Sequence, residues 1–190
     1  MKILMLNYEF PPLGGGAGNA NYFLLKELAK NKNIKIDLVT SSISTDRVEN
    51  FSDTITIHYL DIGKKGNLLY QSNTDLIKYT YKAYYYCRKI ITYQSFDFIH
   101  AFFGIPCGYI ALKLKLPYII SLRGSDVPGH NPYFNNIHKF LYFINKKTWS
   151  RAKAIIANSN DLKNTALKTK FVNKIQVIPN GVDCNFFKPA

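Results

Sequence analysis

The sequence has few cysteines, few acidic residues and no long apolar run, and each shortage argues against a class of protein. Its three cysteines, Cys87, Cys107 and Cys184, lie far apart, so they predict neither a disulfide framework nor a zinc site. Such a sparse, odd set favours a reducing compartment, and hence a cytoplasmic protein. No apolar run approaches the roughly 20 residues that a membrane-spanning helix needs. The first residues enter a strand directly and no small-residue cleavage site follows, so no signal peptide is expected.

Carboxylates are scarce relative to basic residues. The chain has 12 Asp and Glu against 25 Lys and Arg, which gives a net charge of +13. This excess indicates an anionic partner, either a phosphorylated substrate, an acidic membrane surface or nucleic acid. A lysine-rich solvated surface explains it equally well. Nucleic acid is the least favoured partner, because no RNA- or DNA-binding motif accompanies the basic residues.

What the sequence does contain is an alternation of apolar strands and helices, in 190 residues that are 47% hydrophobic. That length is enough for one domain with a substantial core. The alternation predicts an α/β fold, a three-layer Rossmann-like domain with a mostly parallel, roughly seven-stranded sheet. Residues 44–52 are interpreted as a polar connection. The predicted strands are residues 2–6, 34–42, 54–60, 96–103, 117–122, 153–157 and 174–178.

Two predicted helices carry basic faces. In the helix at residues 73–93, an inner stripe of Leu76, Tyr79, Ala83, Tyr86 and Ile90 opposes an outer stripe of Lys78, Lys82, Tyr85 and Lys89. Residues 131–150 are expected to be largely helical, with Ile137, Leu141, Ile144 and Thr148 facing inward and Lys139, Phe143 and Lys146 facing outward. No carboxylate occurs between Asp126 and Asp161. Both basic faces are most simply solvated, and both also suit contact with anionic lipid.

A glycine-rich loop follows the first strand and precedes a helix at residues 19–29. Its glycines are Gly14, Gly15, Gly16 and Gly18. Glycine lets main-chain N–H groups approach a ligand closely, and the positive end of the following helix favours a phosphate. No frame gives the dinucleotide fingerprint G-x-G-x-x-G, because asparagine stands where its third glycine should be. A tight turn without a ligand is the alternative.

Three loops are expected to meet at one edge of the sheet. In doubly wound sheets, ligands bind outside the carboxyl ends of the strands, where the strand order reverses. The glycine loop follows the first predicted strand, residues 100–104 end the fourth, and residues 123–126 end the fifth. A local salt bridge between Arg123 and Asp126 is the alternative to a ligand role for that pair. His58 lies within an alternating strand, so it is interpreted as a sheet or surface histidine.

Five segments together resemble a known family. They are "MKILMLNYEFPPLGGGAGNANYFLLKELAK", "FDFIHAFF", "SLRGSDVP", "AIIANSNDLK" and "VIPNGVD". The pattern resembles the N-terminal half of a glycosyltransferase family 4 enzyme with the GT-B fold, and it covers nearly the whole chain. The resemblance implies two Rossmann-like domains facing across a cleft. The N-terminal one mainly binds the acceptor, while the C-terminal one mainly binds the nucleotide-sugar and supplies an E-x7-E motif.

The resemblance also implies domain limits and site residues. Residues 1–178 would be the N-terminal domain and 179–190 the interdomain junction, with the donor-binding domain absent from this chain. Gly14, Gly15 and Gly16 would approach the donor diphosphate. His100, Arg123 and Asp126 would join them in binding substrate, since His100 matches a histidine of the family's fourth strand.

Arg123 and Asp126 are the candidate catalytic residues. Arg123 stands where many members have the histidine of a His-Gly-x-Asp motif, and Asp126 matches its aspartate. Arginine keeps a hydrogen-bond donor there but cannot act as a base at neutral pH.

The expected function is transfer of a sugar from a nucleotide-sugar donor to a glycan or lipid-linked acceptor, with retention at the sugar carbon. This would be a step of polysaccharide or lipopolysaccharide biosynthesis at the cytoplasmic membrane face, without a metal or other cofactor. The chain alone would be inactive. The alternative is a stand-alone, non-catalytic α/β module that binds an anionic ligand.

Overall fold

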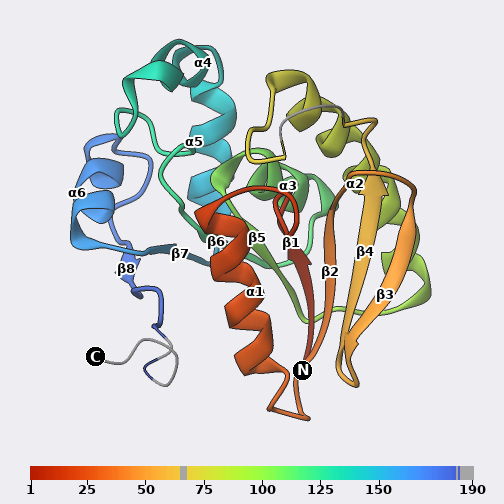
Figure 1. Cartoon of the computed structure of the whole chain (residues 1–190). Helices are drawn as coiled ribbons and strands as arrows, with labels where there is room; N and C mark the ends of the chain where they lie inside the picture. Colours follow the sequence, from red (N-terminus) through yellow and green to blue (C-terminus); the bar gives the residue numbers. More distant parts are fainter. Residues whose placement is uncertain (65–67, 183, 185–190) are drawn as a thin grey trace, which may run out of the picture.

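One sheet runs through the chain, with its strands in the order β3-β4-β2-β1-β5-β6-β7-β8 (Figure 1). The structure is a computed structural model that describes residues 1–64, 68–182 and 184. All neighbouring strands are parallel except β3 and β4. The strands are β1 (Lys2–Leu6), β2 (Lys35–Ser42), β3 (Arg47–Ser52), β4 (Ile55–Asp61), β5 (Phe98–Phe102), β6 (Tyr118–Ser121), β7 (Ala154–Ala157) and β8 (Gln176–Val177). The strand order reverses at β1, which puts the switch point between β1 and β5.

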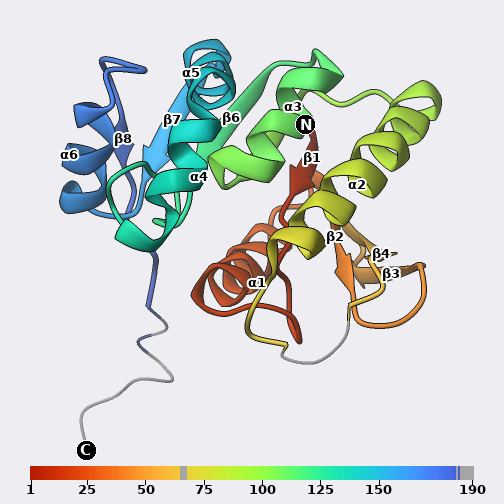
Figure 2. The ribbon, with the colours of Figure 1, turned by 90° about the horizontal axis from the view of Figure 1, so that it is seen from above.

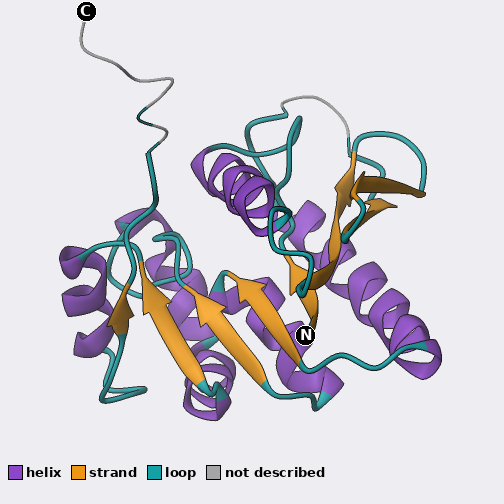
Figure 3. Ribbon diagram, turned by 90° about the horizontal axis from the view of Figure 1, so that it is seen from below, coloured by secondary structure: helices purple, strands orange, loops and turns teal. Residues whose placement is uncertain are grey.

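Helices cover both faces of this sheet. They are α1 (Gly16–Leu28), α2 (Asn73–Tyr93), α3 (Tyr109–Leu114), α4 (Asn135–Phe140), α5 (Tyr142–Arg151) and α6 (Asn160–Lys168), with the short helices η1 (Gly104–Gly108) and η2 (Pro132–Phe134). Right-handed crossovers put α1 on one face and α2, α3 and α5 on the other, as Figure 2 shows. The same layers and the twist of the sheet are seen from below in Figure 3. The predicted three-layer α/β fold is confirmed.

The central strands and the inner face of α2 form the core. Leu4, Met5 and Leu6 of β1 are fully buried, because helices cover a parallel sheet on both sides. On α2, Tyr79 and Ala83 are fully buried as predicted. The Tyr79 hydroxyl donates a 2.9 Å hydrogen bond to the main-chain oxygen of Val39, which fixes the helix against β2.

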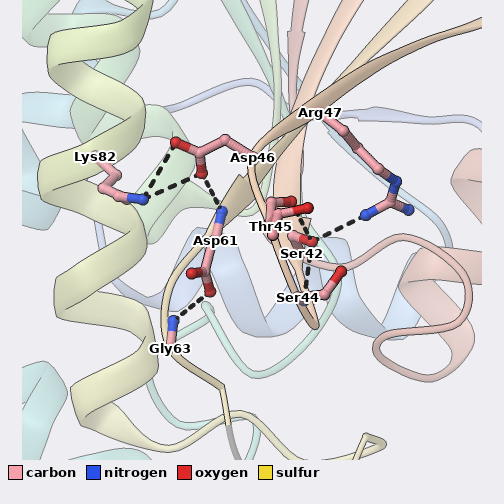
Figure 4. A network of polar contacts seen from close by, with 8 residues as sticks. All are labelled: Ser42, Ser44, Thr45, Asp46, Arg47, Asp61, Gly63 and Lys82. Atoms are coloured by element: carbon pink, nitrogen blue, oxygen red, sulfur yellow. Dashed lines mark hydrogen bonds and ion pairs between the residues drawn. The ribbon is translucent and has the colours of Figure 1, made fainter.

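The prediction for residues 44–52 was wrong, because β3 pairs antiparallel with β4 there. β3 is a polar edge strand, so it lacks the apolar alternation that marks a strand facing the core. The Arg47 guanidinium lies 3.7 Å from the centre of the Tyr59 ring. Before β3, the Asp46 carboxylate accepts hydrogen bonds from the Asp61 N–H at 2.6 Å and from Lys82 at 3.1 Å (Figure 4). The sheet therefore has one strand more than predicted.

The single helix predicted for residues 131–150 is divided into η2, α4 and α5. Leu141 separates α4 from α5, yet its N–H still donates to Ile137 O at 2.9 Å, and Asn145 N–H donates to Leu141 O at 2.8 Å. Thr148 is buried and Phe143 is exposed, as predicted, but Ile144 is 37% exposed and not inward-facing. Asn145 is buried in its place. Asn145 Nδ2 lies 3.4 Å from His138 Nδ1. An inward-facing stripe that is identified from apolar residues alone misses such a buried asparagine.

His58 is a sheet histidine, as interpreted from the sequence. Its Nε2 lies 2.7 Å from Asp37 Oδ1, and its Nδ1 lies 2.8 Å from the Tyr86 hydroxyl. With both ring nitrogens engaged, this side chain links β2, β4 and α2 and is not available to a substrate.

Candidate functional site

The glycine loop joins β1 to α1, and its first glycine has a steric role. Gly14 has φ +85°, and a Cβ there would lie 2.5 Å from the Cβ of Glu9. Only glycine suits both the backbone conformation and the space. A Cβ at Gly15 or Gly16 would meet no heavy atom within 4 Å. Gly14 therefore shapes the loop, and the next two glycines leave open space at the start of α1.

Glu9 lies against the main chain of this loop. Its Oε2 accepts a 3.3 Å hydrogen bond from the Gly15 N–H, and the Gly18 N–H also favours the charged carboxylate. Burial raises the pKa of Glu9, and these hydrogen bonds oppose the rise. The first turn of α1 has no acidic residue of its own. The helix end that the sequence assigned to a ligand phosphate is thus occupied by the protein's own carboxylate.

Sequence reasoning missed Glu9. The only signal was an acidic residue just before a glycine run, and nothing in the sequence shows that the chain folds back to bring the two together. The neighbouring Asn7 is fully buried. Its side chain accepts from the Glu9 N–H at 3.1 Å and donates to Asn21 of α1 at 3.2 Å. These bonds fix the chain on either side of the turn.

Asp126 holds two loops together through main-chain hydrogen bonds. It is 4% exposed. Its carboxylate accepts from the N–H groups of Gly104 at 2.7 Å, Arg123 at 2.9 Å and Gly124 at 3.0 Å. Burial raises the pKa of Asp126, and the N–H groups oppose the rise because they favour the charged form. Asp126 thus shapes the loop after β6 by accepting from the Arg123 main chain, whereas the alternative considered from the sequence was a side-chain salt bridge.

Arg123 is held by an aromatic ring and an amide. Its guanidinium lies 4.2 Å from the centre of the Phe102 ring, and its Nη1 donates to Asn180 Oδ1 at 2.9 Å. Burial lowers the pKa of Arg123 from its usual value. The residue therefore connects the carboxyl end of β6 with the segment that follows β8.

His100 is paired with Ser121, a residue that sequence reasoning did not single out. Its Nε2 lies 2.8 Å from Ser121 Oγ. Burial, together with the positive charge of Arg123, lowers the pKa of His100 to about 3. The ring is therefore neutral at pH 7, where it can exchange hydrogen bonds but cannot provide positive charge.

His100 and Arg123 line one pocket of about 850 Å³, a size typical of small-molecule sites. Its walls come from α1, from the ends of β5, β6 and β7, and from residues 178–182. Gly14, Gly15, Gly16 and Asp126 are not among its lining residues. Among the residues that the structure describes, no group of three acidic, histidine or cysteine side chains could hold a metal ion.

Tyr8 connects the glycine loop with the Asp126 loop. Its ring centre lies 4.6 Å from that of Phe103, which precedes Gly104, the residue whose N–H donates to Asp126 at 2.7 Å. The candidate residues thus form two groups, His100 with Arg123 at the pocket, and the glycine loop with Asp126 on either side of Tyr8. Residues 179–182 and 184 of the predicted junction belong to no helix or strand, and the rest of it lies outside the described residues.

Comparison with known proteins gives a consistent picture. A family model described as Glycosyltransferase Family 4 matches residues 14–186. Sucrose-phosphate synthase from Thermosynechococcus elongatus matches all of this chain and 50% of its own, with a TM-score of 0.76 and 17% identity. The E. coli protein described as trehalose-6-phosphate, bound with UDP-2-fluoro glucose, matches 98% of this chain and 50% of its own, with a TM-score of 0.61 and 10% identity.

A plant protein has the same fold. Phytolacca americana UGT2, complexed with UDP-2-fluoro-glucose and pterostilbene, matches 95% of this chain and 53% of its own, with a TM-score of 0.58 and 12% identity. The chain therefore spans about half the length of these solved proteins. At such identities the likeness shows the fold alone. No curated protein matches the chain.

Proposed function

The chain belongs to glycosyltransferase family 4, and from this premise we propose that residues 1–178 are the acceptor-binding domain of a retaining sugar transferase. The reaction moves a sugar from a nucleotide-sugar to a glycan or lipid-linked acceptor, in the cytoplasm and without a metal or other cofactor. The family match to residues 14–186 is the observation that carries this proposal. Two of the structures with this fold hold a UDP-sugar analogue, which supports the class of donor.

In this proposal the glycine loop takes the donor diphosphate. Gly15 and Gly16 leave open space for it beside the start of α1. The diphosphate then has to take over the Gly15 N–H, which now donates to Glu9. Arg123 and the neutral His100 donate hydrogen bonds to sugar or acceptor oxygens in their pocket. Asp126 positions the loops and touches no substrate.

Glu9→Gln is expected to strengthen the binding of inorganic pyrophosphate by about tenfold. The variant removes one negative charge beside the anion, and about 1.4 kcal/mol corresponds to a factor of ten. Pyrophosphate titrations followed by NMR on the 190-residue chain measure the effect through the Gly15 and Gly16 amide signals.

Glu49→Gln makes the same charge change on the exposed face of β3 and serves as the matched control. Its pyrophosphate affinity should equal that of the wild type. Equal affinity for Glu9→Gln and the wild type, with both proteins folded, would show that the ligand does not use these amides.

Arg123→Ala is expected to lower kcat/KM by around tenfold or more in an active protein that contains this chain. A charge-assisted hydrogen bond to a phosphate or sugar oxygen is worth roughly 1.5–3 kcal/mol. Asn180→Ala separates the alternatives, because it removes the Arg123 partner and leaves the guanidinium in place. If Asn180→Ala reproduces the loss, or if Arg123→Ala lowers only the melting temperature, then Arg123 has a structural role.

The second candidate function is a non-catalytic module that binds an anionic ligand. The placement of Glu9 favours this module in one respect, since an internal carboxylate already accepts from the Gly15 N–H of the loop. The reading frame downstream of residue 190 distinguishes the two candidates. A further domain with an E-x7-E motif supports the transferase, and a stop codon supports the module.

A further inference from the structure

We propose that the outer face of α4 and α5 docks on an anionic lipid surface. This face, called the docking face below, consists of Lys139, Phe140, Phe143, Lys146 and Lys147. Phe140 is 86% exposed and Phe143 is 81% exposed. Exposure of a large apolar side chain to water is unfavourable. Two such side chains on neighbouring turns, among lysines, indicate a partner surface that is both apolar and negatively charged.

The backbone places these five side chains together. The hydrogen bonds from Leu141 to Ile137 and from Asn145 to Leu141 keep the helical repeat across the break between α4 and α5. Positions three and four residues apart therefore share a side, as Lys139, Phe143 and Lys146 do, and as Phe140, Phe143 and Lys147 do. The opposite side is anchored in the protein, where Thr148 and Trp149 are fully buried.

The charge of the docking face is uncompensated. No carboxylate occurs in the sequence between Asp126 and Asp161, and Asp126 is buried and bonded to main-chain N–H groups. Within the described residues, none of the ion pairs involves Lys139, Lys146 or Lys147. Anionic headgroups would supply the missing negative charge.

The basic stripe of α2, which the sequence also indicated for lipid contact, is less suitable. Figure 4 shows Lys82 of this stripe paired with both carboxylate oxygens of Asp46, at 3.1 and 3.4 Å. Nearby, Lys64 pairs with Asp75 at 3.1 Å. These carboxylates reduce the attraction of this side of the molecule for an anionic surface, so the docking face is the better candidate.

Other occupants fit the docking face less well. A second copy of the chain would bring like charges together. A nucleic acid would satisfy the lysines but gives the two phenylalanines no apolar phase to enter, as the headgroup boundary of a bilayer does. In the proposed contact, α4 and α5 lie along the surface. Among the described residues no helix has the length and apolar character to cross a bilayer. This inference is independent of the proposed sugar transfer.

Vesicle co-sedimentation of the 190-residue chain tests the inference. Vesicles containing phosphatidylglycerol are expected to sediment the protein at low salt, and pure phosphatidylcholine vesicles are not. The triple variant Lys139→Gln, Lys146→Gln, Lys147→Gln should lower the partition coefficient by on the order of 100-fold. The double variant Phe140→Ser, Phe143→Ser should lower it by roughly tenfold or more and leave the salt dependence in place.

The matched control is Lys78→Gln, Lys82→Gln, Lys89→Gln, which removes the same charge from α2. If this control loses as much binding as the triple lysine variant of the docking face, binding follows net charge and the docking face is refuted. Equal binding to both vesicle types, or binding to single-stranded RNA without binding to vesicles, also overturns the proposal. Circular dichroism verifies that each variant is folded. We expect the fold to be retained, because the substituted side chains are exposed.

Discussion

Asp126→Ala is expected to lower the free energy of unfolding by roughly 3–5 kcal/mol, because three main-chain N–H donors lose their acceptor. The carboxylate is 4% exposed, so water has little access to the N–H groups of Gly104, Arg123 and Gly124 that it now satisfies. Urea denaturation of the 190-residue chain, with the m-value compared between variants, measures the loss. Such a result would make Asp126 a structural residue of the site.

Two variants sharpen this measurement. Asp53→Ala removes a carboxylate that is 86% exposed and paired with Lys32, and it should change stability little. Asp126→Asn keeps an acceptor oxygen, so its loss should be smaller than that of alanine. Because the pKa of Asp126 is raised in the folded protein, ionisation of this carboxyl lowers stability as the pH rises from 3.8 through the folded pKa. The asparagine variant cannot ionise, so it should lack this pH-dependent loss of stability. If Asp126→Ala left stability unchanged but abolished activity, Asp126 would instead be a catalytic residue.

The second large effect is the absence of catalysis by the chain alone. The 190 residues should melt cooperatively, since the strands and the inner helix faces enclose one core, yet sugar transfer should be undetectable. The chain covers about half of each of the three solved proteins compared above. A donor held on one side only would lose the positioning of its reacting carbon, which is worth roughly 7–11 kcal/mol of the barrier.

Scanning calorimetry and titration with common nucleotide-sugars measure both parts of this expectation. A single cooperative transition with donor affinity weaker than micromolar is the expected result. Micromolar donor affinity, or transfer to any acceptor by this chain, would contradict the two-domain proposal. A broad, non-cooperative melt would show that residues 1–178 need a partner to fold.

The strands that the sequence predicted well are those whose burial is visible in composition. β1 is almost wholly apolar because both of its faces are covered, and it was identified with its bounds. β3 was missed because its polar side chains lie at the edge of the sheet. The inward position of Ile144 was wrong because Asn145, a polar residue, takes the buried place beside His138.

At the candidate site, the sequence could predict which loops meet but not which atoms contact one another. The loops after β1, β5 and β6 were expected at one edge, and Tyr8, Phe103 and Asp126 do connect them. The pairing of Glu9 with the glycine loop depends on a turn of the backbone, and no single residue type in the sequence predicts that turn. The roles of Gly14, Gly15, Gly16, His100 and Arg123 toward a substrate stay predictions.

The contact between Gly14 and Glu9 also constrains how this loop can evolve. Any side chain at position 14 would overlap the Cβ, Cγ and carboxylate of Glu9. A mutation that replaces Gly14 therefore incurs both the steric clash with Glu9 and the cost of a positive φ. If residue 9 is shortened first, the clash is removed but the cost of the positive φ remains. The order of mutations is thus constrained, and glycine at position 14 should be retained even in homologues that have lost the glutamate.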